Sequence, residues 1–372
     1  MKALALGGAT VDIIASVSDD EIERMTMHNA ITNFLLLEEG KKVEAETIET
    51  HTGGGAINAS VSMAKLGLDI SCVVKLGDDI EGQMVLKRLE QTGVGSKWVI
   101  KGSDLPTGCA VMVSSHVRNP TIFVARGANT LLTPDEIRPE MFTDVGLTYV
   151  TGLSGASADC FPKIVRLAKE AGSLVVANPG IRQLTSRTQS FWDSLANIDV
   201  LVLNEVEAAR LLPFVSAKSE KDFTGCCAYS SEKSLPELLK KGVGVTGARL
   251  SLEGFVSTIT QFGPKQVLVT NGKEGAYLGT DQEIVFCPAQ KAKVMGTAGA
   301  GDSFASTFSA FIALGQGDET ALKAAAINAA SVVSVMDTQS GLLGKDEILH
   351  QITKADWGKL KRYPTGNRVS KG

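Results

Sequence analysis

One segment of the sequence places an acidic side chain among small residues in a way that could do chemistry. Residues 296–304 read Gly-Thr-Ala-Gly-Ala-Gly-Asp-Ser-Phe, between a strand-like segment, 291–295, and a long apolar helical segment, 304–314. Glycines let backbone approach a ligand closely, and free N–H groups at a helix start favour an anion. A bound phosphate would repel Asp302 unless the carboxylate had work there, such as accepting a proton from a hydroxyl that attacks phosphorus. A tight turn with a capping Asp is the structural alternative.

A second glycine-rich segment, residues 53–58, reads Gly-Gly-Gly-Ala-Ile-Asn and opens an alanine-rich helical pattern that stops at Gly67. Its glycines could bring backbone close to a polar ligand. Asn58 can donate and accept hydrogen bonds at once, as a polyol demands. A loop with a helix cap explains the segment equally well, so both interpretations stay open.

Two expected strands end in polar residues. Asn204 and Glu207 follow the apolar run 200–203, and their oxygens are of the kind that hydrated Mg²⁺ prefers, although Asn204 could merely cap a helix. Residues 267–275 read as a strand that ends in a polar, glycine-punctuated turn. Open α/β sheets bind ligands at such strand ends.

The elements that must position these residues alternate between strand and helix signals. Short β-branched runs without clean alternation suit a parallel sheet covered on both faces, so we expect an α/β fold. Two segments break the rhythm: residues 11–52 are long and polar, and residues 110–113 and 122–125 look like a hairpin. Together they predict a small accessory sheet, which is either a lid over an active site or a passive insertion. We therefore expect a core of residues 1–10, 53–106 and 127–372, a β-lid of residues 11–52 and 107–126, and an insertion in the core at 213–262.

Composition excludes several classes of protein. The formal net charge is −4 and no basic stripe is evident, which argues against a nucleic-acid partner. No apolar run approaches 18 residues, so we expect no membrane span, and the first residues read as a buried strand rather than a signal peptide. The six cysteines include no C-x-x-C pair, which fits a reduced, cytoplasmic protein without a zinc motif.

Taken in order, these motifs resemble the ribokinase-like family of pfkB carbohydrate kinases over nearly the whole chain. The Gly-Ala-Gly-Asp turn is the most specific match, and further matches are Leu76-Gly77-Asp78-Asp79, Pro106-Thr107-Gly108 and Gly127-Ala128-Asn129. The resemblance implies a three-layer sandwich with a central, mostly parallel sheet and a small β-sheet lid. It also implies ATP-dependent phosphorylation of a sugar hydroxyl with Mg²⁺.

The resemblance also assigns roles to single residues. Asp302 matches the catalytic base, and the backbone of Gly299, Ala300 and Gly301 matches the anion hole. Glu207 matches the acidic residue tied to Mg²⁺ and phosphate. Residues that match substrate-hydroxyl positions are Asp12, Gly54 and Asn58. Residues that match positions near the nucleotide are Asn204, Thr270, Gly272 and Asn328.

Some features depart from the family pattern or leave the substrate open. Gly296 stands where many members have an Asp that helps to hold a monovalent cation, so potassium activation stays open. Arg126 either faces the cleft, where it would favour an acidic or phosphorylated substrate, or is a surface arginine. A sugar kinase is the favoured function; a nucleoside kinase and a non-catalytic metabolite-binding homologue are the alternatives. A homodimer is possible, since lid-mediated dimers are common in such families.

Overall fold

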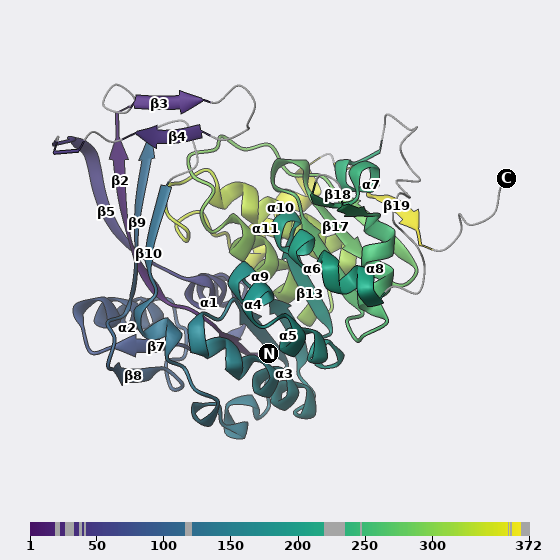
Figure 1. Ribbon diagram of the computed structural model, residues 1–372, viewed down its shortest axis with the longest axis horizontal. Helices are drawn as coiled ribbons and strands as arrows, with labels where there is room; N and C mark the ends of the chain where they lie inside the picture. Colours follow the sequence, from purple (N-terminus) through teal and green to yellow (C-terminus); the bar gives the residue numbers. More distant parts are fainter. Residues whose placement is uncertain are drawn as a thin grey trace.

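The computed structural model describes residues 1–18, 23–26, 33–36, 39–40, 42–115, 121–218, 235–245, 248–355, 357 and 359–365. A nine-stranded sheet forms its centre, as Figure 1 shows. In spatial order its strands are β19 (Lys361–Pro364), β18 (Glu283–Cys287), β17 (Ala276–Gly279), β16 (Gln266–Thr270), β13 (Val200–Asn204), β12 (Leu174–Asn178), β11 (Leu147–Thr151), β1 (Lys2–Leu6) and β6 (Asp69–Val73).

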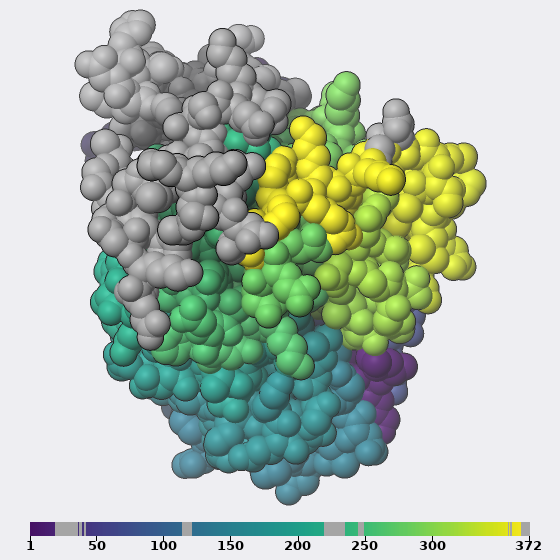
Figure 2. Space-filling model, turned by 90° about the vertical axis from the view of Figure 1, so that its right-hand side faces the viewer, coloured from purple at the N-terminus to yellow at the C-terminus, as the bar shows by residue number. Residues whose placement is uncertain are grey.

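Six of these strands, from β6 to β16, run parallel, and the last three pair antiparallel. Figure 2 shows the face at the antiparallel edge, where the yellow C-terminal residues lie beside green ones. The predicted mostly parallel α/β sheet is confirmed. The prediction of a strand at 291–295 was wrong: Met295 instead donates its backbone N–H to Val333 O at 2.8 Å. The outer edge of β18 is already paired with β19, so no sheet position is left there.

Helices cover both faces of the sheet, which makes three layers. In β1, Ala3 and Ala5 pack into one apolar cluster while Leu4 and Leu6 pack into the other. The first cluster is covered by α1 (Gly55–Lys65), α2 (Ile80–Gln91), α9 (Ala300–Ala313), α10 (Asp318–Val332) and α11 (Lys345–Lys354). The second is covered by α3 (Phe161–Glu170), α4 (Ile181–Ser186), α5 (Thr188–Asp193), α6 (Glu205–Lys218), α7 (Glu237–Lys241) and α8 (Leu252–Thr260).

A separate four-stranded sheet, here called the lid sheet, stands beside this core (Figure 1). Its order is β10 (Thr121–Ala125), β9 (Gly108–Ser115), β2 (Thr10–Val17) and β5 (Ala45–Gly53). Three short pairs complete the described strands: β3 (Glu23–Thr26) with β4 (Asn33–Leu36), β7 (Lys75–Gly77) with β8 (Ile100–Ser103), and β14 (Val243–Val245) with β15 (Ala248–Leu250).

The segment expected to be an insertion, 213–262, is partly core. Helix α6 continues through Pro213 to Lys218, so the helix does not end where we expected the insertion to begin. Helix α8 buries Leu252, Phe255 and Ile259 in the second cluster. Residues 219–234 and 246–247, which include Cys226 and Cys227, lie outside the described residues.

Polar bonds join the base of the lid sheet to the core. Asp79, at the start of α2, accepts hydrogen bonds from the N–H and the hydroxyl of Thr107, each at 2.6 Å. Asn129 exchanges two hydrogen bonds with the backbone of Ala9, one from Ala9 N at 2.9 Å and one to Ala9 O at 2.7 Å. The Leu76-Gly77-Asp78-Asp79, Pro106-Thr107-Gly108 and Gly127-Ala128-Asn129 motifs therefore lie where the lid sheet meets the core. Among the described residues, no helix has both the length and the apolar content needed to cross a bilayer.

Candidate active site

A pocket of about 250 Å³ opens where the carboxyl ends of the parallel strands meet the lid sheet. Asp302, Glu207 and Arg126 supply its charged side chains. The start of α1 contributes Gly54, and the end of β11 contributes Thr151. A larger hollow, of about 720 Å³, lies beside α2, but none of these residues lines it. The smaller pocket is therefore the candidate active site, because it holds Asp302, Glu207 and Arg126.

The start of α9 reaches this pocket through Asp302, which lines it. Gly299 caps the helix with φ 77°, a conformation that suits glycine, and a Cβ there would lie 2.7 Å from Thr338 Cβ. A Cβ added at Gly301 would instead meet no atom within 4 Å. Among the described residues, the N–H groups of Gly301 and Asp302 have no backbone carbonyl partner. With these two N–H groups the turn has room and donors for an anion, while Ala300 N donates to Thr297 O at 3.4 Å.

Asp302 is held by Asn58, which lies 244 residues away in the sequence and donates Nδ2–H to Asp302 Oδ2 at 2.8 Å. The other end of that amide accepts from Thr338 Oγ1 at 2.8 Å and from Gln339 Nε2 at 3.0 Å. These two donors fix which end of the amide faces Asp302. Burial raises the pKa of Asp302, and the Asn58 hydrogen bond opposes that rise.

Glu207 and Asn204 cap the start of α6 reciprocally. Glu207 Oε2 accepts from Asn204 N, and Asn204 Oδ1 accepts from Glu207 N, each at 2.9 Å. Burial raises the pKa of Glu207 to about 7, and the charge of Asp302 adds to the rise. The capping interpretation of Asn204 is therefore correct for its Oδ1 atom, while Glu207 still lines the pocket.

Asp12 lies at the base of the lid sheet, 4% exposed, and accepts a hydrogen bond from Thr10 Oγ1 at 2.7 Å. Burial raises the pKa of Asp12, and the charge of Asp302 acts in the same direction. Gly54 has φ 91°, and a Cβ there would lie 2.6 Å from Gly8 O. This close approach requires glycine at position 54 and sets the start of α1 against the end of β1.

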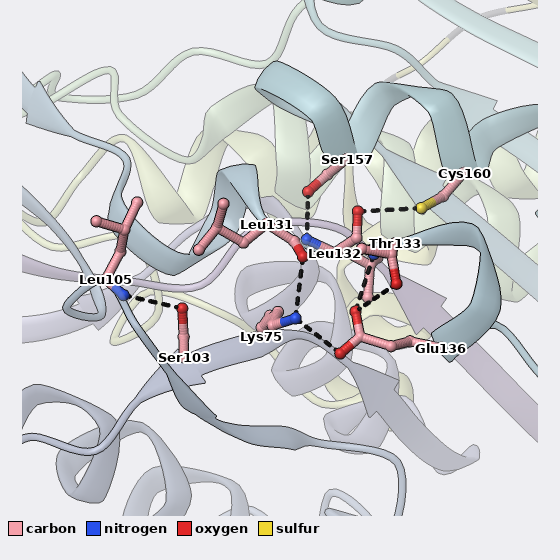
Figure 3. A network of polar contacts seen from close by, with 9 residues as sticks. All are labelled: Lys75, Ser103, Leu105, Leu131, Leu132, Thr133, Glu136, Ser157 and Cys160. Atoms are coloured by element: carbon pink, nitrogen blue, oxygen red, sulfur yellow. Dashed lines mark hydrogen bonds and ion pairs between the residues drawn. The ribbon is translucent and has the colours of Figure 1, made fainter.

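Arg126 follows β10 and donates from Nη1 to Ser154 Oγ at 2.8 Å. The segment that follows Arg126 is hydrogen-bonded to Lys75, which donates to Leu131 O at 2.9 Å and to Glu136 Oε1 at 2.7 Å (Figure 3). Leu132 N in turn donates to Ser157 Oγ at 2.8 Å (Figure 3). Arg126 therefore follows a lid strand and leads into a segment that is bonded to the core.

A model of the pfkB family carbohydrate kinases matches residues 14–227 and 245–344. The chain belongs to the pfkB family. It is 24% identical over 270 residues to a ribokinase of Staphylococcus aureus, covering 72% of this chain and 77% of the relative. It is also 24% identical over 350 residues to a 5-dehydro-2-deoxygluconokinase of Listeria innocua, covering 91% and 98%.

Solved structures agree on the fold of this pfkB kinase. Arabidopsis thaliana ribokinase complexed with ribose and ATP superposes with a TM-score of 0.68 at 22% identity, covering 94% of this chain and 97% of the other. A Burkholderia thailandensis nucleoside kinase in complex with inosine gives 0.68 at 17% identity, covering 95% and 98%. The predicted family and ribokinase-like sandwich are thus confirmed.

The residues predicted to lie near the nucleotide fall into two groups: three lie at or just after strand ends, and one is buried among helices. Asn204 and Thr270 are register partners at the ends of β13 and β16, and Gly272 begins the next turn with φ 48°. Asn328 is 0% exposed; its amide donates to Thr307 Oγ1 at 2.8 Å and accepts from Leu343 N at 2.9 Å. Both ends of the Asn328 amide are thus bonded inside the protein, and its predicted place near the nucleotide stays a prediction.

The sequence interpretation missed the partners that orient Asn58. Thr338 and Gln339 lie in the loop after α10, and Gln339 Oε1 accepts from Arg88 Nε at 2.9 Å. The only signal was a run of four polar residues, Asp-Thr-Gln-Ser at 337–340, after an apolar helix. Near this loop, a Cβ added at Gly296 would lie 3.4 Å from the carbonyl oxygens of Val335 and Met336. Potassium activation stays an open prediction.

Proposed function

We propose that this pfkB kinase transfers the γ-phosphoryl group of ATP to a hydroxyl group of a sugar. The observation that carries the proposal is the position of Asp302: its carboxylate lines a pocket directly beside the open N–H groups at the start of a 14-residue helix. A carboxylate there can take the proton of a hydroxyl while the amides stabilise negative charge on the transferred group. Complexes of related structures with ribose and ATP, and with ADP, support the same chemistry.

In this mechanism Asn58 keeps Asp302 ionised and oriented, and Asp12 and the start of α1 at Gly54 help to position the sugar. Amides of residues 299–302 face the phosphoryl group, and Asn204, Thr270 and Gly272 border the nucleotide. Most of the acceleration comes from positioning and preorganised electrostatics. Closure of the lid sheet would exclude water and suppress ATP hydrolysis.

Glu207 is the residue that would hold Mg²⁺. Among the described residues, no group of three His, Cys, Asp or Glu side chains is arranged for a metal ion. A single carboxylate beside the pocket still fits Mg²⁺, which keeps several waters and binds through one or two carboxylates together with substrate phosphates. When bound, the ion would neutralise charge on the β- and γ-phosphate oxygens.

A nucleoside substrate is the second candidate, because one structural neighbour binds inosine. An aromatic side chain would help to hold a base by stacking, but Phe123 on β10 is 58% exposed and does not line the pocket, which weighs weakly against a nucleoside. The side chain of Phe34, the other candidate for stacking, lies outside the described residues. The sugar therefore remains the favoured substrate.

The test is ADP formation with pentoses, hexoses, acidic sugars and nucleosides, using the wild-type chain and Asp302→Asn. The variant keeps the shape of the side chain but removes the base, so we expect turnover to fall by about 10² to 10⁴-fold with a near-native melting temperature. Asp144→Asn, at an exposed carboxylate that pairs with Lys2, is the matched control. More than about a tenth of wild-type activity in Asp302→Asn would refute the assigned role.

A further inference from the structure

Arg126 is a positively charged group of the pocket for which the described residues supply no carboxylate partner. It is partly buried, and its one described side-chain bond goes to the Ser154 hydroxyl at 2.8 Å. Within the described part of the chain, no Asp or Glu forms an ion pair with it. Burial lowers the pKa of Arg126, and the nearby charge of Arg182 lowers it further. A cation in this setting is stabilised when an anion joins it.

A second arginine strengthens the positive charge at this place. Arg182, on α4, is exposed and close enough to Arg126 to act on its charge. The described residues hold no ion-pair partner for Arg182 either. The two like charges repel each other, so a bound anion would be stabilised beside them, to an extent limited by the solvent exposure of Arg182.

The pocket therefore carries two carboxylates, Asp302 and Glu207, and a separate positive charge at Arg126. The charge of Asp302 contributes to the raised pKa of Glu207, after the larger effect of burial. Neither carboxylate is among the groups that shift the pKa of Arg126. The acidic side chains and the arginine thus line one pocket without pairing. A substrate that carries an anion at the end remote from its reactive hydroxyl would match both places.

We infer that Arg126, supported by Ser154 and Arg182, binds a terminal oxyanion of the substrate, and that the phosphoryl acceptor is an acidic sugar rather than a neutral one. The inference deepens the proposed function and rests on it. A guanidinium offers several N–H donors in a planar fork that matches a carboxylate or a phosphate oxygen pair. Because Ser154 uses Nη1 and is itself 7% exposed, it fixes the plane of the fork and leaves other donors for the ligand.

The test compares matched pairs of acceptors in the ADP-formation assay: gluconate with glucose, ribonate with ribose, and, for the phosphate source, ribose 5-phosphate with ribose. The readout is the ratio of kcat/KM for the acidic member to that for the neutral member. We expect this ratio to exceed 1 in the wild-type chain and to fall by about 10 to 100-fold in Arg126→Ala, the range of a lost charge-assisted hydrogen bond. Arg126→Lys should recover part of the ratio, since it keeps the charge but not the fork.

The control is Arg187→Ala, which removes an exposed arginine that pairs with Asp159 outside the pocket and should leave the ratio unchanged. A preference for neutral acceptors that Arg126→Ala does not alter would overturn the inference while the kinase activity stands. Calorimetric titration of gluconate, ribonate and ribose 5-phosphate without ATP separates the two proposals. Arg126-dependent binding without any ADP formation would support the anion site and refute the proposed reaction, and equal binding to wild type and Arg126→Ala would overturn the inference.

Discussion

Replacing Asn58 with alanine removes the hydrogen bond that Nδ2 donates to Asp302 Oδ2 across 2.8 Å. Because that bond favours the ionised carboxylate, its loss raises the pKa of Asp302 beyond the rise that burial already causes. A hydrogen bond to a charged group contributes about 1.5 to 3 kcal/mol, and one pKa unit corresponds to about 1.4 kcal/mol. We therefore expect the pKa of Asp302 to increase by about 1 to 2 units in Asn58→Ala.

The assay is kcat against pH at saturating substrate, which reports the ionisation of the base in the enzyme–substrate complex. The base must be ionised to act, so the acidic limb of the profile should move to higher pH by the same amount, and activity should recover as pH rises. The charge of Asp302 also acts on Glu207, Asp12 and Tyr149, so the shift is taken as the difference between the Asn58→Ala and wild-type profiles, which share these groups.

Gln339→Leu provides a graded comparison. It removes one of the two donors to Asn58 Oδ1 and leaves Thr338, so the amide keeps part of its fixed orientation. We expect a shift of the acidic limb in the same direction but smaller than in Asn58→Ala. A uniform loss of kcat at every pH, with the limb unmoved in both variants, would refute the reasoning, because Asn58 would then act on the substrate alone.

Two further predictions concern the neighbouring carboxylate and the glycines of the α9 turn. Burial raises the pKa of Glu207 from 4.5 to about 7, so the stability that the protonated side chain gives at low pH is lost as pH rises through that interval. Without Mg²⁺, the free energy of unfolding of wild type should fall between pH 5 and 8 by about 1 to 2 kcal/mol more than that of Glu207→Gln, after allowing for solvent screening. The same pH dependence of the melting temperature in both proteins would contradict this. Gly301→Val should melt near wild type, because its Cβ enters open space, yet lose about 10²-fold or more in kcat by filling the anion site. Gly299→Val should instead lower the melting temperature clearly, because φ is 77° and Thr338 is 2.7 Å from the new Cβ; equal melting of the two variants would count against the turn geometry.

Local patterns predicted the parts of this fold that depend on neighbouring residues. The alternation of short apolar strands and helices predicted the central sheet, and the helix after β7 begins at a cap, Asp79, that accepts a hydrogen bond from Gly82 N. The Gly-Ala-Gly-Asp turn begins a helix, because small residues and a positive φ at Gly299 suit that turn. The same local logic failed at 291–295, where the residue pattern resembles a strand but β19 already occupies the sheet edge.

Contacts between distant residues could not be predicted in this way. Asn58 meets Asp302, Thr338 and Gln339 across 244 to 281 residues, and no periodicity connects those positions. The partners of Asn328 are a second example of contacts between distant residues. Its amide bonds to Thr307 and to the backbone of Leu343, contacts that no local pattern indicates, while its predicted place near the nucleotide stays a prediction.

The position of Arg126 bears on when its oxyanion would bind. The residue follows β10, but the 3₁₀ turn that comes next, Gly127–Thr130, is tied to the core by the two bonds between Asn129 and Ala9. If the lid sheet closes by turning about this 3₁₀ turn, the strands of the sheet would move. Arg126 would remain hydrogen-bonded to Ser154 of the core. The anion site would then exist before closure. This is why an acidic sugar should bind to the chain without ATP, and why Arg126→Ala should weaken that first binding step rather than only the later chemical one.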